Sequence, residues 1–487
     1  MQLERGSADT GPELSPPGLW ERLRAVRSTT EPPNHADSRR AVIVGAGIAG
    51  LLAARVLADH YPDVVVLDRD RLPATPANRR GTPQDRHVHA LFTGGLRAID
   101  ALLPDFTDEL SDRGGHRIDV GRDLALATRH GWGVRFDSGL HAVGASRPLI
   151  EATVRQRVLA VPGVHLLQHT QADGLIGSPQ HLGAVRVRDL TTGTVSELAA
   201  DLVVDAGGRG SHLPQWLARL GCPPVPETVV NAHTGYATRL FRLPRPPALW
   251  RSCYVMAMGP HTTRGGAIAP VEGDRWIVTL YGIGRDRPTP AAEDFLPFAR
   301  SLPAPAIAEA LTDAEPLTPV RCTNATTNRR RHLARAGGLP DNLVAIGDSS
   351  CCFNPVYAQG MTVAALSARV LASSLDRQGV RPGFARRYHH RLDALHSTPW
   401  MLATTADLAF RGTEGPAPSP VRRLLARHLD RVIAAGTHDR RAQAAFLEVL
   451  TMAAHPAVLL TPRVALSAAT ARHGTSHPPT HSAPGHG

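Results

Sequence analysis

Lysine is absent from this 487-residue chain, so all 54 of its basic residues are arginines, and the net charge is +11. Such an excess can attract nucleic acid or an anionic membrane. Aromatic residues, however, are scarce at 5%, and they do not interleave with the scattered arginines as a base-stacking platform would require. We therefore expect a solvated basic surface and no nucleic-acid partner.

Two further shortages limit the class of protein. The five cysteines have no CxxC spacing, which favours a reduced, cytoplasmic protein (Cys222, Cys253, Cys322, Cys351 and Cys352). No stretch approaches the ~18 uninterrupted apolar residues of a membrane helix, so we expect no membrane span.

We predict disorder for residues 1–40, rich in Pro, Ser, Glu and Arg, and for the Ser/Pro/His/Gly-rich residues 472–487.

What the sequence does contain is an alternation of strand and helix patterns. A strand, a glycine turn, a helix and a second strand follow one another over residues 41–70, and a helix is expected near Pro148–Ala160. Three runs rich in Val, Ile, Thr and Tyr predict one antiparallel sheet: Gly235–Phe241, Ser252–Met258 and Arg275–Tyr281. From Leu343 a strand, a loop and helices follow. This order predicts an α/β fold with an inserted sheet domain.

The first motif with chemical content is VIVGAGIAG at residues 42–50, a G-x-G-x-x-G turn between an apolar strand and a helix. Gly45 permits the tight turn, Gly47 lets the backbone approach a pyrophosphate, and Gly50 lets helix and strand pack closely. The second strand ends in Asp68, where a carboxylate accepts hydrogen bonds from a ribose diol. The unit predicts a dinucleotide site but does not choose between NAD and FAD.

A second apolar strand ends in Gly-Asp at residues 347–348 and is followed by FNPVYAQGM at 353–361. This arrangement resembles the second flavin motif of the para-hydroxybenzoate hydroxylase-like monooxygenases. The resemblance implies bound FAD, with Asp348 on the ribityl chain and the loop after Pro355 at the pyrimidine edge of the ring. There Gln359, Gly360 and Met361 would supply a helix start, whose dipole stabilises negative charge on a reduced flavin.

The chain departs from that family pattern at three positions. Cys352 and Ala358 replace a frequent histidine and a glycine of the second motif, and Ala206 replaces the glycine of the Asp-Gly motif within residues 205–211. The vicinal Cys351 and Cys352 are better explained as small residues packed beside a cofactor than as a redox pair. Because the Asp-Gly motif is linked to the nicotinamide, the reductant, NADPH or NADH, is inferred less directly than FAD.

Three arginines complete the predicted cofactor set. Arg147 matches the arginine that the family places near the flavin, although an ordinary helix-start arginine explains it equally well; Arg69 and Arg86 are assigned with it. The resulting division gives a discontinuous, Rossmann-like FAD-binding domain at 41–225 and 320–375. A substrate-binding β-sheet domain is predicted at 226–319 and a helical C-terminal region at 376–471.

Runs on both sides of these motifs resemble the flavin-dependent epoxidases of polyether-antibiotic biosynthesis, of the monensin and lasalocid type. They include RRGTPQDRHVHAL at 79–91, GYATRLF at 235–241, EPLTPV at 315–320 and PWMLAT at 399–404. The histidines at 87 and 89 lack the further ligands of a metal site, so no metal is expected. The resemblance implies oxygen transfer from O₂, through a C4a-hydroperoxyflavin, to an alkene of a natural-product intermediate.

Rival functions share this scaffold. A halogenase is disfavoured because those enzymes need a lysine and a W-x-W-x-I-P signature, and this chain has neither. An aromatic hydroxylase and a flavin-dependent isoprenoid reductase stay open. We expect a hydrophobic small-molecule substrate and no indispensable acid–base pair, because the flavin carries the chemistry. The sequence leaves open whether a separate flavin reductase is a partner. Tyr236 or Tyr357 would only orient the substrate.

Overall fold

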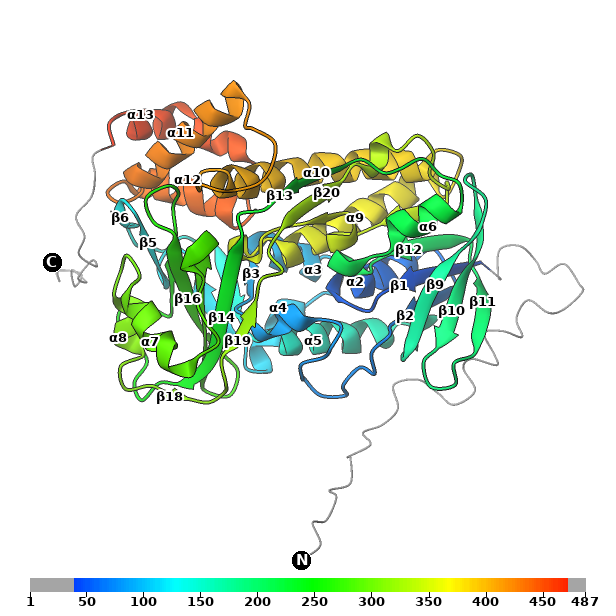
Figure 1. The fold of residues 1–487 in the computed structure, drawn as a ribbon, viewed down its shortest axis with the longest axis horizontal. Helices are drawn as coiled ribbons and strands as arrows, with labels where there is room; N and C mark the ends of the chain where they lie inside the picture. Colours follow the sequence, from blue (N-terminus) through cyan, green and yellow to red (C-terminus); the bar gives the residue numbers. More distant parts are fainter. Residues whose placement is uncertain (1–38, 472–487) are drawn as a thin grey trace, which may run out of the picture.

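A five-stranded parallel sheet forms the centre of the larger lobe in the computed structural model, which describes residues 39–471 (Figure 1). Its strand order is β21-β12-β1-β2-β8, with β1 Arg40–Val44, β2 Asp63–Leu67, β8 Val164–Leu167, β12 Leu202–Asp205 and β21 Leu343–Ala345. The strands are almost wholly buried runs of Val, Ile and Leu, as a parallel sheet covered on both faces requires. The predicted Rossmann-like α/β fold is confirmed. The predicted leader and tail lie almost entirely outside the described residues.

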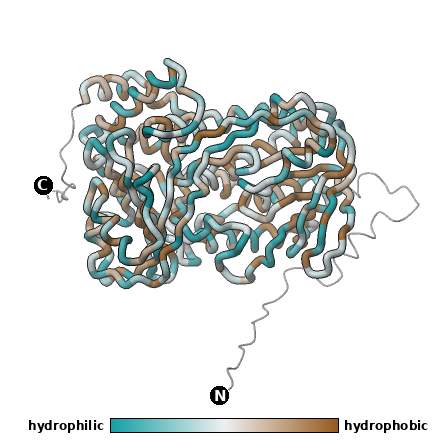
Figure 2. Tube along the Cα trace, viewed as in Figure 1, coloured by the Kyte–Doolittle hydropathy of each residue, from teal (hydrophilic) through white to brown (hydrophobic). Residues whose placement is uncertain are grey.

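Helices cover one face of this sheet and a smaller sheet covers the other. On the first face α2 (Ile48–Leu57), α5 (Arg147–Leu159), α9 (Gly360–Gln378) and α10 (Phe384–Asp407) bury their apolar sides against the strands. On the second face lie β9 (Thr170–Gly177), β10 (Leu182–Asp189), β11 (Val195–Ala199) and the short helix α6 (Leu213–Arg219). The apolar segments run mainly along these inner elements (Figure 2).

The second lobe is built on an eight-stranded sheet of order β18-β14-β17-β16-β15-β5-β6, with β19 also paired to β14. Its strands are β5 Leu124–Thr128, β6 Gly131–Trp132, β14 Thr234–Arg242, β15 Ser252–Val255, β16 Arg264–Val271, β17 Arg275–Ile283, β18 Glu315–Pro316 and β19 Arg321–Thr323. The sheet is wider than the sequence predicts, because β5 joins it through a parallel pairing with β15. Helices α7 (Ala292–Arg300) and α8 (Ala306–Ala310) pack on one face.

Alternation along β14 separates its two faces as expected. Tyr236 and Thr238 are buried, whereas Arg239 lies on the opposite face and donates from Nε to the carbonyl of Thr318 over 2.7 Å.

Small sheets and helices connect and cap the two lobes. The sheets are β3 (Ala90–Phe92), β7 (His141–Gly144) and β4 (His116–Asp119), and β13 (Glu227–Val230), β20 (Asn328–Arg331) and β22 (Cys351–Cys352). Two short helices, α3 (Thr93–Asp100) and α4 (Phe106–Asp112), follow β3 in the chain. The C-terminal helices α11 (Pro420–Ala435), α12 (Arg440–Leu450) and α13 (Pro462–Ala469) form a separate group over the β5–β6 end of the large sheet (Figure 1). Between residues 39 and 471 no helix is long and apolar enough to cross a bilayer.

Candidate flavin-binding site

Three motifs that are far apart in sequence end on adjacent strands. The amide of Gly45, after β1, donates to the carbonyl of Leu67 over 2.8 Å, and the amide of Ala206, after β12, donates to Val44 over 2.9 Å. The amide of Ile346, after β21, donates to Asp205 over 3.0 Å. Because the strands are parallel, all three motifs meet at the carboxyl edge of the sheet, where open α/β sheets bind their ligands.

The three glycines of the turn at residues 45–50 differ in backbone conformation and in the space around them. Gly45 has φ +105°, and a Cβ there would lie 2.5 Å from the carbonyl oxygen of Ala206. A Cβ on Gly50 would lie 1.9 Å from the carbonyl oxygen of Gly45, so that residue is required by the packing of α2 on the turn. Gly47 has φ −77°, which any residue adopts, and a Cβ there would meet no atom within 4 Å. Neither the backbone nor the packing of the chain requires glycine here, so the open side of Gly47 is available to a ligand.

The second loop also borders open space. A Cβ on Gly360, the first residue of α9, would have only Asp348 Oδ1 near it, at 4.0 Å, and Pro355 is exposed. Gln359 Oε1 and Thr362 Oγ1 are buried and have no hydrogen-bond partner within the described residues. Such unsatisfied groups are rare in native proteins, and an ordered water or a polar ligand can satisfy them.

Asp348 lies half-buried at the start of this loop. Burial raises the pKa of its carboxyl, while the charges of Arg209, Arg147 and Arg329 act in the opposite direction. A carboxylate placed among cations but bonded to none of them is free to accept a hydrogen bond from a sugar-like hydroxyl chain.

Asp68 makes more hydrogen bonds within the chain than the sequence suggests. Its Oδ2 accepts the amide of Ala46 over 2.9 Å and lies 3.2 Å from Arg79 Nη1. Arg79 also donates from Nε to Glu151 Oε1 over 2.7 Å and contacts Asp70. Burial raises the pKa of Asp68, partly offset by Arg79. Its predicted role at a ribose stays a prediction, and Arg79 and Glu151, which the sequence reasoning missed, belong to the same ionic cluster.

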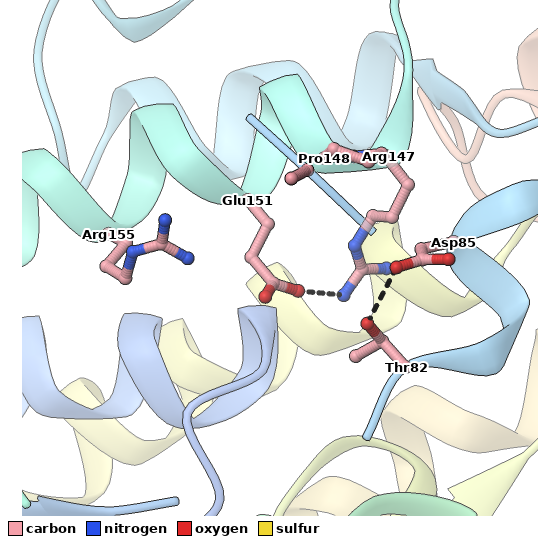
Figure 3. Close-up of a pocket in the computed structure, with 7 residues that line it drawn as sticks. Thr82, Asp85, Arg147, Pro148, Glu151 and Arg155 are labelled. Atoms are coloured by element: carbon pink, nitrogen blue, oxygen red, sulfur yellow. Dashed lines mark hydrogen bonds and ion pairs between the residues drawn. The ribbon is translucent and has the colours of Figure 1, made fainter. Parts of the chain in front are cut away.

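Arg147 points from the first turn of α5 toward this cluster (Figure 3). Its Nη2 contacts Glu151 Oε2 at 3.2 Å, and its buried Nε has no hydrogen-bond partner among residues 39–471. A cavity of about 10 Å³, room for about one water molecule, lies beside it and is lined also by Thr82 and Asp85. The assignment of Arg147 to the flavin stays a prediction, and its Nε is a donor that the described residues leave unused.

The other two predicted arginines lie at the surface. Arg69 is exposed, and exposed Arg86 is 4.0 Å from Asp85 Oδ1 at its Nε. Neither is drawn into the buried ionic cluster, so their assignment to the cofactor rests on the sequence alone.

The Asp205 side chain of the Asp-Gly motif stabilises its own turn by hydrogen bonds. Asp205 is 1% exposed and accepts the amide of Gly207 over 3.0 Å and the hydroxyl of Ser211. Arg209 donates from Nη2 to the carbonyl of Phe353 over 2.8 Å, and so joins this turn to residues 353–361, called here the flavin loop. Each oxygen of the buried Asp205 carboxyl therefore accepts one hydrogen bond from its own turn.

The histidine pair 87/89 lies between the sheets. His87 Nδ1 is 2.7 Å from Thr238 Oγ1, and His89 Nδ1 is 2.9 Å from the carbonyl of His87. Burial lowers the pKa of His87 to about 4 and that of His89 to about 3, so both are neutral near pH 7. In the described part of the chain no three His, Cys, Asp or Glu side chains converge as a metal site requires.

A polar cluster that sequence reasoning missed connects the large sheet to the flavin loop. Asp407, at the end of α10, is 1% exposed and accepts the hydroxyl of Tyr357 over 2.6 Å. Asn354 bonds both Asp407 and the hydroxyl of Tyr236, the latter over 2.7 Å. No local pattern marks Asp407, which lies about 50 residues after the motif that it contacts.

These features fit a dinucleotide with an extended ring system. Gly47 leaves room at the start of α2 for a pyrophosphate, Asp348 is placed for a hydroxylated chain, and the start of α9 offers free amides and unpartnered side chains for a polar ring edge. Two helix starts at one sheet edge, with the Asp348 carboxyl beside the second, are the arrangement expected in a flavoprotein of the FAD class.

The chain belongs to the family described as "FAD binding domain", whose model matches residues 39–378. It is 32% identical to Protein Rv3254 of Mycobacterium tuberculosis, over 78% of this chain and 82% of that protein. It is 30% identical to kynurenine 3-monooxygenase of Salinispora arenicola, over 67% of this chain and 70% of that one. The chain is thus an FAD-binding enzyme of the flavin-dependent monooxygenase class.

Solved structures agree on the fold. A probable FAD-dependent monooxygenase of Pseudomonas aeruginosa, PqsL, superposes with a TM-score of 0.55 at 18% identity, over 76% of this chain and 97% of that one. The flavin-dependent brominase Bmp2 superposes with a TM-score of 0.60 at 13% identity, over 84% of this chain and 92% of that one. At such identities the likeness concerns fold alone, and a halogenase stays disfavoured because lysine is absent.

Proposed function

We propose that this enzyme adds one oxygen atom from O₂ to an alkene of a hydrophobic natural-product intermediate and so forms an epoxide, with NADPH or NADH as reductant. The monooxygenase part rests on the family match, and the observation that supports the flavin site is the open space beside Gly47 and Gly360, where a Cβ would meet no atom closer than Asp348 Oδ1 at 4.0 Å. The epoxide rests on the resemblance of residues 79–91, 235–241, 315–320 and 399–404 to polyether epoxidases.

The flavin, when bound, would supply the activation of O₂. The chain's own part is to hold and enclose it. Amides at the start of α2 would bind the pyrophosphate, Asp348 the ribityl hydroxyls, and the amides of Gly360 and Met361 the polar edge of the ring. The face of β14 that carries Tyr236 and Thr238 would border the substrate and exclude water.

The decisive experiment is aerobic turnover under ¹⁸O₂ with a panel of polyenes and phenols, analysed by mass spectrometry. We expect one labelled oxygen added across an alkene. Conversion of phenols to catechols with inert alkenes would replace the epoxide proposal, and product formed only without O₂ would point to a reductase of isoprenoid double bonds.

An aromatic hydroxylase is the second candidate, and the Tyr357–Asp407 hydrogen bond favours it. Such enzymes must stabilise a phenolate, and a tyrosine bonded to a buried carboxylate at the flavin loop offers a proton acceptor.

The source of electrons has its own test. Because Ala206 replaces the glycine of the Asp-Gly motif, we expect slow oxidation of NAD(P)H in the absence of substrate. Stopped-flow mixing should record bleaching of the flavin by NADPH or NADH. No bleaching by either, with bleaching after addition of a flavin reductase, would assign reduction to a separate partner protein.

A further inference from the structure

The exposed aliphatic side chains of the described chain gather on its C-terminal helices, which lie together at one corner of the molecule (Figure 1). Residues 39–471 expose seven large aliphatic side chains, and four of them belong to α11, α13 and the turn before α13: Val421, Leu424, Leu460 and Leu466. These four are 56–67% exposed, whereas the other three are 39–46% exposed. Single exposed aliphatic residues are ordinary, but such a concentration is typical of a surface that contacts a partner.

Three of the four side chains lie on neighbouring parts of one surface. Val421 and Leu424 are three residues apart on α11, and His428 follows one turn later, so the three lie on one flank of the helix. His428 Nε2 donates to the carbonyl of Leu459 over 2.8 Å, which brings the adjacent Leu460 to this flank. Leu459 is buried and Leu460 is exposed. Val421, Leu424 and Leu460 are called here the apolar strip.

Exposed arginines border the apolar strip. Arg423, Arg427 and Arg431 recur every four residues along the solvent-facing side of α11, and Arg463 lies in the first turn of α13. None of these four guanidinium groups has an ion pair or a hydrogen bond within the described residues. Arg427 is three residues from Leu424, so basic and aliphatic side chains lie side by side on the outer surface of one helix.

The acidic side chains nearest in sequence do not neutralise these arginines. Residues 408–435 contain two acidic residues, Glu414 and Asp430. Glu414 Oε1 lies 3.1 Å from His233 Nε2, and Asp430 Oδ2 accepts from Arg129 Nη2 over 2.5 Å. Both carboxylates thus have partners outside α11, and the surface around the apolar strip keeps its positive charge.

The sign of this charge decides which partner fits the surface. A second copy of the chain, related by a two-fold axis, would bring the same arginines together, and like charges repel. An anionic bilayer surface instead offers phosphate groups to the arginines and an acyl boundary to the aliphatic side chains. Helices that lie in the plane of a membrane interface combine these two kinds of residue.

We propose that α11 and the adjoining Leu460 dock the enzyme peripherally on an anionic lipid surface. The apolar strip enters the boundary between headgroups and acyl chains, and the arginines of α11 bind lipid phosphates. The segment that leads into α11 reaches the large sheet, because Phe410 packs in one cluster with Tyr236 of β14. Docking would therefore hold this sheet near a membrane, into which a hydrophobic substrate partitions. The inference concerns a surface apart from the flavin site and does not depend on the proposed reaction.

The test is co-sedimentation of the flavin-loaded full chain with vesicles of phosphatidylglycerol and phosphatidylcholine, or of phosphatidylcholine alone. We expect binding to the anionic vesicles, much weaker binding to the neutral ones, and release at about 1 M salt, where the Debye length is about 3 Å. Leu424→Ser combined with Leu460→Ser should weaken binding at least about tenfold, because two aliphatic side chains no longer enter the lipid. Arg427→Gln combined with Arg431→Gln should weaken it about thirtyfold, at about fivefold for each arginine.

Val195→Ser and Arg300→Gln are the matched controls, since both residues are exposed on other elements, β11 and α7. Both should bind vesicles like wild type. Every variant should keep the flavin content and unfolding temperature of wild type, because the substituted side chains face solvent.

Three results would overturn the proposal. The first is failure of wild type to bind anionic vesicles, or equal binding to neutral ones. The second is wild-type binding by both double variants of the C-terminal helices, which would place the lipid contact elsewhere in the chain. The third is a dimer in light scattering that dissociates in the double leucine variant while no vesicles are bound, which would assign the apolar strip to a second copy of the chain.

Discussion

Substitution of Gly47 should impair ligand binding, whereas substitution of Gly50 should impair folding. Gly47 has an extended backbone and open space around its missing Cβ, whereas a Cβ on Gly50 would lie 1.9 Å from the carbonyl oxygen of Gly45. We therefore expect Gly47→Val to fold normally and lose FAD. Gly50→Ala should instead shift α2 away from the turn and lower the stability of the protein itself.

The structure sets the scale of both effects. In Gly50→Ala the carbon–oxygen contact must lengthen by more than about 1 Å to reach ordinary packing distance, an overpacking that costs about 1–3 kcal/mol. In Gly47→Val the branched side chain fills the space beside the first amides of α2. Loss of even one hydrogen bond to a charged pyrophosphate, about 1.5–3 kcal/mol, weakens FAD binding about tenfold to hundredfold.

The assay compares flavin per polypeptide after gel filtration with the thermal unfolding of flavin-free protein. Gly47→Val should be colourless and unfold at the wild-type temperature. Gly50→Ala should unfold at a lower temperature even without flavin. Full flavin content in Gly47→Val would show that the pyrophosphate does not lie at this turn, and the reasoning about the site would be wrong.

Three further substitutions have expected outcomes. Asp348→Ala should yield folded protein with little flavin, measured by absorbance after gel filtration, because the carboxylate assigned to the ribityl chain is lost. Glu151→Gln should lower the unfolding free energy by about 3 kcal/mol at neutral pH, since Arg79 and Arg147 lose their shared partner. Burial alone would raise the pKa of Glu151, but the two arginines hold it below the ordinary value. The difference from wild type should therefore disappear as the pH falls through that depressed value, as denaturant titrations at several pH values would record. Asn354→Ala should cost about 1–3 kcal/mol in the same assay at neutral pH, because it leaves the hydroxyl of Tyr236 without its acceptor.

Much of the flavin site is local in sequence, and such parts were predictable. The turn at 45–50 and the loop at 355–361 each bring their residues together within a few positions, through glycine sterics and a helix start. The alternation of strand and helix patterns likewise predicted the α/β fold class. The large sheet was predicted less well, because β5 joins β15 across more than 120 residues and its short run has no distinctive periodicity.

Sequence alone determined the class of protein and the type of cofactor, because these depend on backbone conformations that short motifs encode. Only the tertiary structure decided which side chains face one another. It placed Arg79 between Asp68 and Glu151. It also joined Asp205 to Ser211 by a hydrogen bond and left Arg69 and Arg86 exposed. It also brought Asp407 to Tyr357. A buried carboxyl and its partners are selected by three-dimensional complementarity, and residues 50 positions apart carry no local pattern that records the contact.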